Sequence, residues 1–148
     1  MSNQQDANAN LMMEILHLIE QRQLDRLGDF YHPKIEFHWP PGLPYSGDFT
    51  GPAVEEMSKR FATTWIPLQP TPETRRMNPR VLAVGEDGHV IVNYVWRGVD
   101  AKGERFETEV LADYQVRDGR LLRAQMFYYD LPGLIAFVDG AQPSRAKA

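Results

Sequence analysis

Residues 80–129 read RVLAVGEDGHVIVNYVWRGVDAKGERFETEVLADYQVRDGRLLRAQMFYY. Runs rich in Val, Leu, Tyr and Phe alternate with polar residues here, as half-buried strands do. Asp-Gly pairs at 87–88 and 118–119 separate these runs, and a loop at 100–103 makes a third joint. Asp-Gly is one of the strongest hairpin signals. The stretch therefore predicts a meander of antiparallel strands in which consecutive strands are neighbours.

Three helices are predicted ahead of this meander. The first begins at Asn8 or Asn10 as its cap, because apolar residues recur at helical spacing from there to Ile19. A second, short helix is predicted at 24–30. The third follows Gly-Pro at 51–52, since proline is favoured in a first helical turn.

A strand is predicted between the second and third helices, in the segment KIEFHWPPG at residues 34–42. Its apolar side chains Ile35, Phe37 and Trp39 share one face, opposite Glu36 and His38, before the Pro-Pro-Gly stop. After it the sequence LPYSGDFTG is rich in turn residues.

Two further segments complete the prediction. Four prolines between residues 66 and 79 predict a loop, with a lid as one interpretation. At the other end, Asp130-Leu-Pro-Gly is predicted to open a short helical tail through Leu134 to Val138, and the last eight residues are expected to fray.

The 148 residues predict a single domain over 1–148, with a core at about 9–138 and flexible ends. A net charge of −4 argues against nucleic acid as a partner, and no apolar run is long enough to span a membrane. The chain has no cysteine, and its first ten residues do not resemble a signal peptide. We therefore expect a cytoplasmic protein without disulfides.

These elements predict an α+β fold, with three N-terminal helices packed on a curved antiparallel sheet that encloses a pocket. On the strand at 89–99, alternation places Val92, Tyr94 and Trp96 together, and we assign them to the outer face. So large an exposed apolar row favours a homodimer through that face, although a covering loop is the alternative.

The order of elements resembles that of the nuclear transport factor 2-like superfamily. The resemblance covers residues 9–138 and is carried by LDRLGDFYHPKIEF, GPAVEEM, VRDGRLLRAQ and FYYDL. More narrowly, the chain is similar to SnoaL-like proteins, which include polyketide cyclases, ketosteroid isomerases and limonene epoxide hydrolases. The resemblance implies a cone-shaped fold around a pocket for a small hydrophobic molecule, and cofactor-free isomerase, cyclase or dehydratase chemistry.

The acid-base residues of these relatives are missing here, so whether the chain is an enzyme stays open. Where ketosteroid isomerases carry a tyrosine and two aspartates, this sequence has Ile15, Trp39 and Ala112. The limonene epoxide hydrolase set falls on Val95, Asn93, Phe127 or Met126, Phe37 and Trp39. A non-catalytic ligand-binding or dimerisation module is therefore the alternative.

Aromatic residues are the predicted lining of the pocket, since ligand cavities are mostly apolar. The predicted ring-bearing residues are Phe37, Trp39, Phe61, Trp65 and Phe127. The alternative is that these rings simply fill the core. Asn93, Arg97 and Gln125 are predicted to face inward and bind polar atoms of a ligand, with structural hydrogen bonding or exposure as the alternative.

Asp113 and Tyr31 are the candidate catalytic residues. Asp113 would act as an acid or base if a bulge turned it inward, whereas strict alternation turns it outward. Tyr31 would donate a hydrogen bond into the pocket from the junction of helix and strand. The histidines lack the paired spacing of metal ligands, and no cofactor motif is present, so we predict neither a metal nor a cofactor.

Overall fold

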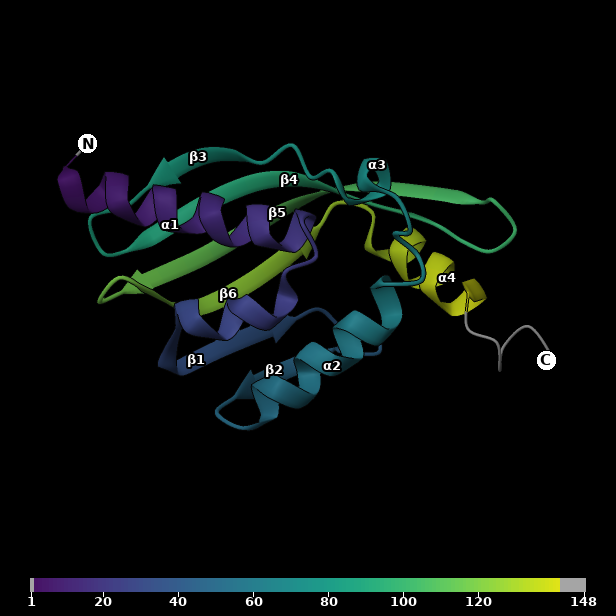
Figure 1. The fold of residues 1–148 in the computed structure, drawn as a ribbon, viewed down its shortest axis with the longest axis horizontal. Helices are drawn as coiled ribbons and strands as arrows, with labels where there is room; N and C mark the ends of the chain where they lie inside the picture. Colours follow the sequence, from purple (N-terminus) through teal and green to yellow (C-terminus); the bar gives the residue numbers. More distant parts are fainter. Residues whose placement is uncertain (1, 142–148) are drawn as a thin grey trace.

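A computed structural model describes residues 2–141 as helices packed on a single curved sheet (Figure 1). The elements in chain order are α1 (Asn3–Glu20), the 3-10 helix η1 (Leu24–Phe30), β1 (Tyr31–Trp39), β2 (Gly47–Thr50), α2 (Ala53–Trp65), α3 (Pro72–Arg75), β3 (Arg80–Val84), β4 (His89–Val99), β5 (Arg105–Arg117), β6 (Arg120–Tyr128) and α4 (Leu131–Ala141). The predicted α+β class and the predicted meander are confirmed.

The sheet has six strands in the order β2-β1-β6-β5-β4-β3. Its neighbouring strands are antiparallel, except that β1 runs parallel to β6. The prediction of an antiparallel sheet is therefore wrong at this one pair. No hairpin joins β1 to β6, because α2 and the meander lie between them in the chain, so local turn signals do not set their relative direction.

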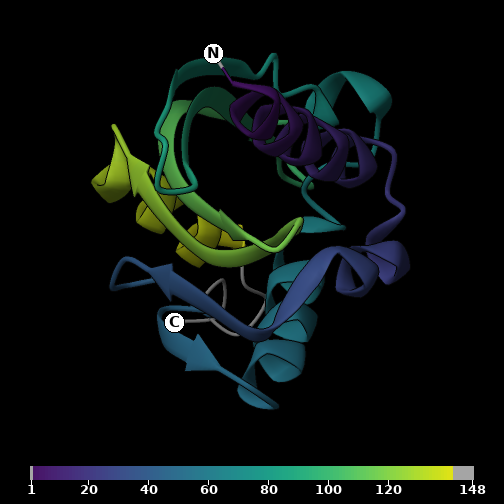
Figure 2. The ribbon, with the colours of Figure 1, turned by 90° about the vertical axis from the view of Figure 1, so that its left-hand side faces the viewer.

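The sheet curls around α1, and α1, η1 and α2 cover its concave side (Figure 2). The pairing register shifts in β1 between Tyr31 and Glu36, in β3 between Val81 and Ala83, and in β5 after Gln115. Such irregularities bend a strand and increase its twist. The bent strands leave room for a cavity between the sheet and the helices.

Helix α1 begins earlier than the sequence predicted. The hydroxyl of Ser2 accepts a hydrogen bond from the Gln5 backbone N–H, and the Gln5 side chain accepts one from the Ser2 N–H. This capping box starts the helix at Asn3. Both predicted caps, Asn8 and Asn10, instead lie within the helix, where Asn8 is buried and accepts a hydrogen bond from Gln4.

The turn-rich segment after β1 contains the short strand β2, which pairs with β1 through Phe37↔Phe49 and three other residue pairs. Tyr45, which precedes β2, is completely buried. The sequence prediction therefore missed both a strand and a core residue here, because polar turn residues surround them.

The proline-rich segment between α2 and β3 is fixed to β4. Val95 N–H donates to the Met77 carbonyl and Val99 N–H to the Leu68 carbonyl, each at 2.8 Å. Met77 and Leu68 are buried. The segment therefore extends the sheet edge ahead of β3, and these bonds hold it to β4 as a fixed loop.

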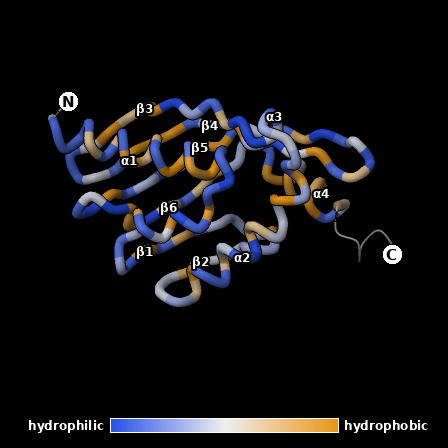
Figure 3. The backbone as a smooth tube through the Cα atoms, in the orientation of Figure 1, coloured by the Kyte–Doolittle hydropathy of each residue, from blue (hydrophilic) through white to orange (hydrophobic). Residues whose placement is uncertain are grey.

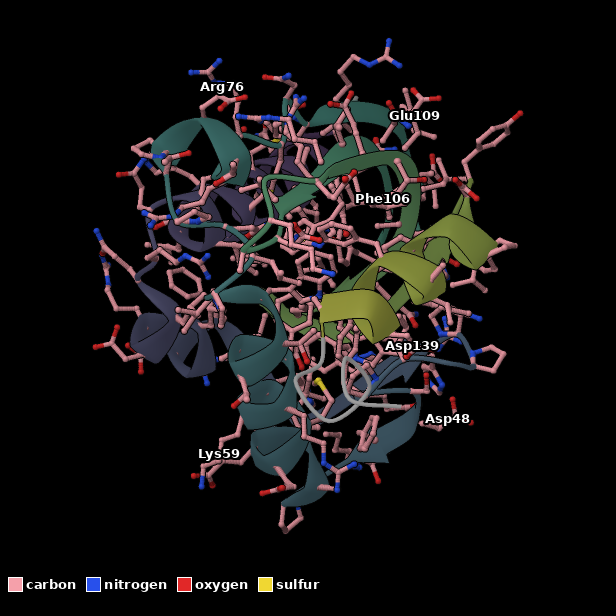
Figure 4. The ribbon with its side chains drawn as sticks, turned by 90° about the vertical axis from the view of Figure 1, so that its right-hand side faces the viewer. Asp48, Lys59, Arg76, Phe106, Glu109 and Asp139 are labelled. Atoms are coloured by element: carbon pink, nitrogen blue, oxygen red, sulfur yellow. The ribbon has the colours of Figure 1, made fainter. Side chains whose placement is uncertain are left out.

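Helix α4 forms where the helical tail was predicted, continues to Ala141, and packs on β5 beside Phe106 (Figure 4). The rings of Phe137 and Phe106 stack with centroids 5.5 Å apart. Hydrophobic and hydrophilic residues alternate along the strands, which gives each strand one core-facing side (Figure 3). Of the last eight residues, predicted to fray, 142–148 lie outside the described residues. No helix within residues 2–141 is long and apolar enough to cross a membrane.

Candidate functional site

A cavity of about 480 Å³ lies between the concave face of the sheet and the helices α1, η1 and α2. Its wall is mostly aliphatic and aromatic, and includes Ile15, Leu16, Leu27, Tyr31, Ile35, Phe37, Trp39, Met57, Phe61, Met77, Tyr94, Trp96, Tyr114, Met126 and Tyr128. Exposed lining residues at Gly28, Pro52 and Glu55 place the mouth between η1 and the start of α2.

Aromatic rings form one continuous wall of this cavity. Trp39 stacks on Phe61 with ring centroids 5.3 Å apart, and Phe61 lies 5.6 Å from Trp96. Phe37 stacks on Trp39 at 6.2 Å. Because Trp39 is the last residue of β1, its inward side chain closes the cavity at this end.

Four tyrosines, Tyr31, Tyr94, Tyr114 and Tyr128, contribute phenol groups to the cavity lining. Burial raises the pKa of each phenol above its ordinary value, since a phenolate in this environment would lose its hydration. All four therefore remain protonated near neutral pH and can donate hydrogen bonds.

The tyrosine hydroxyls also interact with one another. Tyr94 and Tyr114 are hydrogen-bonding partners, as are Tyr128 and Tyr45. Tyr45 in addition accepts a hydrogen bond of 2.8 Å from Trp65 Nε1. A phenol both donates and accepts, so such a cluster can satisfy itself internally or turn a hydroxyl toward a bound molecule.

The indole nitrogens of Trp39 and Trp96 differ from this cluster. Both nitrogens are shielded from solvent, and neither has a hydrogen-bond partner in the described part of the chain. Both rings line the cavity. An unpaired buried N–H is costly, so these two groups are notable exceptions in an otherwise well-satisfied core.

Among the described residues, Glu55 is the one charged residue that lines the cavity. It lies at the mouth, is highly exposed, and has Lys59 Nζ 3.8 Å from its carboxylate. The same residues contain no group of three or more His, Asp or Glu side chains that could hold a metal ion. The interior is therefore uncharged.

The predicted faces of β4 are reversed in the structure. Tyr94 and Trp96 point into the cavity and are only 5% and 4% exposed. Asn93 and Arg97 lie on the outer face, where Asn93 accepts a hydrogen bond from Arg80 and Arg97 pairs with Glu107 at 2.7 Å. Alternation defines which residues share a face but not which face is inner, and the larger apolar side chains are buried.

Three more candidates lie on the outer face rather than in the cavity. Asp113 Oδ1 is 2.7 Å from His89 Nδ1, and Gln125 accepts a hydrogen bond from Arg123. Phe127 is 52% exposed, while its neighbour Met126 lines the cavity. The bulge that would have turned Asp113 inward is absent, because β5 pairs with β4 in unbroken register from Arg105 to Gln115, and Asp113 faces outward as strict alternation indicated.

The remaining candidates are on or beside the cavity. Tyr31, Phe37, Trp39 and Phe61 line it, whereas Trp65 is fully buried behind the wall against Trp96. Tyr94 and Tyr128 were missed as cavity residues. The hairpin register could have found Tyr94, because Tyr94 pairs directly with Val110, and alternation along β5 places Val110 on one face with Ala112 and Tyr114.

The sequence pattern of the SnoaL-like domain matches residues 13–124, most of the chain. This chain belongs to the SnoaL-like family. No curated protein matches it closely enough to be counted as a relative.

Solved structures share the fold of this chain. One provisionally assigned as a polyketide cyclase, from Xanthomonas campestris pv. campestris, has a TM-score of 0.70 and 21% identity, covering 90% of this chain and 98% of that one. One provisionally assigned as an isomerase, from Bacillus subtilis, has a TM-score of 0.72 and 14% identity over 95% and 98%. TerC, co-crystallised with polyporic acid, has a TM-score of 0.69 and 18% identity over 88% and 95%. At these identities the likeness concerns the fold.

Proposed function

We propose that this SnoaL-like protein binds a small, uncharged, largely apolar molecule in its cavity. The cavity itself carries the proposal, because about 480 Å³ of apolar space with a few polar groups is typical of a ligand site. Its mouth between η1 and α2 gives a route of entry. The uncharged interior favours a neutral ligand, since an ionised one would lose its hydration without gaining a partner.

The tyrosine cluster favours oxygen atoms on that ligand. Tyr31 and Tyr114 lie on the cavity as protonated phenols, and each can donate to a carbonyl or hydroxyl oxygen. We infer that an apolar molecule with one or a few oxygens fits this lining better than a pure hydrocarbon.

Binding is tested by titration with N-phenyl-1-naphthylamine, an uncharged probe whose fluorescence rises in apolar sites. We expect saturable binding with one probe per chain. Ser58→Trp places a large ring at the cavity wall on α2 and should abolish most of this binding. Thr63→Trp is the matched control, because Thr63 is exposed on the same helix away from the cavity. Failure to saturate, or equal binding by the two variants, would contradict the proposal.

A second candidate function is cofactor-free isomerase or cyclase chemistry on the bound molecule. The cluster of buried tyrosines favours it, as do the similar solved structures provisionally assigned as a polyketide cyclase and an isomerase. Protonated tyrosines can polarise a ketone and favour its enol, whereas the uncharged interior supplies no carboxylate to remove the proton. The tyrosines would therefore serve as hydrogen-bond donors to the ketone oxygen, and a water molecule in the cavity would accept the proton that the C–H group releases.

This second candidate is tested by exchange of the α-protons of 1-tetralone in D2O, followed by NMR. Catalysis predicts exchange faster than in buffer, and slower exchange with Tyr114→Phe. Exchange at the buffer rate while the ketone remains bound would assign the protein to binding alone.

A further inference from the structure

Two arginines share one carbonyl oxygen between the end of α1 and helix α3. Arg22, which follows α1, donates from Nη2 to the Gln69 carbonyl oxygen at 2.9 Å. Arg75 of α3 donates from Nε to the same oxygen, also at 2.9 Å. The two nitrogens therefore lie no farther apart than twice that distance. Both arginine side chains are half-buried, and Gln69 is buried.

Neither guanidinium has a carboxylate partner within the described residues. The glutamates closest to them along the chain bind elsewhere. Glu20 accepts a hydrogen bond of 2.7 Å from a backbone N–H, and Glu73 pairs with Arg105 at 3.3 Å. Burial and the nearby charge of Arg75 both lower the pKa of Arg22, so the two cations oppose each other.

Both side chains keep donors that the chain itself does not use. Every hydrogen bond of the Arg22 guanidinium to residues 2–141 comes from Nη2, so Nε and Nη1 have no acceptor among them. Arg75 donates from Nε and Nη2, which leaves Nη1. Arginine presents its N–H groups in a planar fork that matches the oxygens of a phosphate group. Two such forks that converge without a carboxylate of the chain favour an external oxyanion.

We propose that Arg22 and Arg75 together bind a phosphate group, either as the free ion or as part of a small ester. A doubly charged oxyanion offsets the repulsion between the guanidiniums and accepts hydrogen bonds from their remaining N–H groups. The bonds to Gln69 and Pro70 already hold both guanidiniums in place, which lowers the entropy cost of binding. Neither arginine lines the cavity, so this site is separate from the proposed ligand cavity.

Phosphate binding is measured by titration at neutral pH, followed in the ¹H–¹⁵N spectrum of the protein. Sodium chloride keeps the ionic strength constant, so that general screening does not contribute to the response. We expect the backbone signals of residues 20–24 and 69–76 to shift saturably, with one phosphate per chain. Inorganic phosphate and methyl phosphate are titrated separately, and saturable binding of either supports the site. Comparison of the two shows whether the site takes the free ion or an ester.

Arg75→Gln removes one of the two charges and should weaken phosphate binding about tenfold or more, the usual value of a hydrogen bond to a charged group. Arg76→Gln is the matched control, because Arg76 is the next residue, is exposed, and makes no ion pair within the described residues. It should leave the affinity nearly unchanged. Arg75 is preferred to Arg22 for this test, since Arg22 also bonds to the Trp65 carbonyl at the end of α2. Thermal unfolding checks that both variants fold.

Three outcomes would overturn the inference. The first is a response to both phosphates that grows without saturation. The second is equal weakening in the two variants, which would mean general attraction of phosphate to a basic surface. The third is unchanged binding in Arg75→Gln, which would mean that the two arginines only brace the loop between α2 and α3. None of these outcomes affects probe binding in the cavity, so the proposed function is tested independently.

Discussion

Trp65 Nε1 donates a hydrogen bond of 2.8 Å to the hydroxyl of Tyr45, and both side chains are completely buried. The bond joins the end of α2 to the segment before β2. Tyr45 also packs edge-on against Trp39 and Phe61, with ring centroids 4.8 and 4.9 Å away. The aromatic wall of the cavity is therefore held from behind by this pair.

Tyr45→Phe should lower the free energy of unfolding by about 1–3 kcal/mol, because it leaves the Trp65 N–H buried without an acceptor. Urea denaturation followed by tryptophan fluorescence measures the change. Tyr129→Phe removes the same hydroxyl from a side chain that is 88% exposed, and should change stability by less than about 0.5 kcal/mol. Similar losses in the two variants would show that the buried bond contributes nothing.

Adjacent residues on β4 test the assignment of its faces. Trp96→Ala removes a buried ring from the cavity wall and should cost about 3–5 kcal/mol of stability. Arg97→Ala breaks a pair with Glu107, whose side chain is 60% exposed, and should cost less than about 1 kcal/mol. Probe affinity should change in the Trp96 variant alone. A change in probe affinity in the Arg97→Ala variant would mean that the Arg97 side chain reaches the cavity, which would contradict this assignment of the faces.

Local signals in the sequence were enough to predict the meander. The Asp-Gly turn at 87–88 joins β3 to β4 and the one at 118–119 joins β5 to β6, and both pairs are antiparallel hairpins. Trp39 also points to the cavity, as alternation along β1 indicated. The parallel pairing of β1 with β6 was not predictable in this way, because it depends on contacts between segments that no single turn connects.

The candidate site was harder to predict than the fold. Alternation shows which residues of β4 share a face, but not which face points inward. Because Asn93 and Arg97 were assigned to the inner face, Tyr94 and Trp96 were assigned to the outer one, and both assignments were wrong. Applying the β4–β5 register first would have corrected it, since residues opposite each other share a face. Tyr45 had no such signal, because its burial depends on packing between β1 and α2.

Alkaline pH should destabilise the fold through the buried tyrosines. Burial raises the folded-state pKa of Tyr31, Tyr45, Tyr94, Tyr114 and Tyr128. As pH rises through the ordinary value near 10, the unfolded chain loses these protons while the folded chain keeps them, so stability falls.

The expected slope approaches about 1.4 kcal/mol per pH unit for each tyrosine that is still protonated in the fold. Urea denaturation at a series of pH values between about 8 and 11 measures it. Tyr114→Phe should reduce this slope by the contribution of one tyrosine, about 1.4 kcal/mol per pH unit. A free energy of unfolding that is constant over this range would contradict the burial of these phenols.

The homodimer through the outer face stays a prediction, and its residues change because Tyr94 and Trp96 are in the cavity. On that face Leu111 and Phe127 are paired across β5 and β6, and are 42% and 52% exposed. A charge there would be forced into the apolar contact between two copies, so Phe127→Lys should convert a dimer to a monomer. Size-exclusion chromatography with light scattering measures this, with Ile66→Lys, equally exposed but beyond the end of α2, as the control. A wild-type monomer at high concentration, or a Phe127→Lys variant that stays dimeric, would rule out this interface.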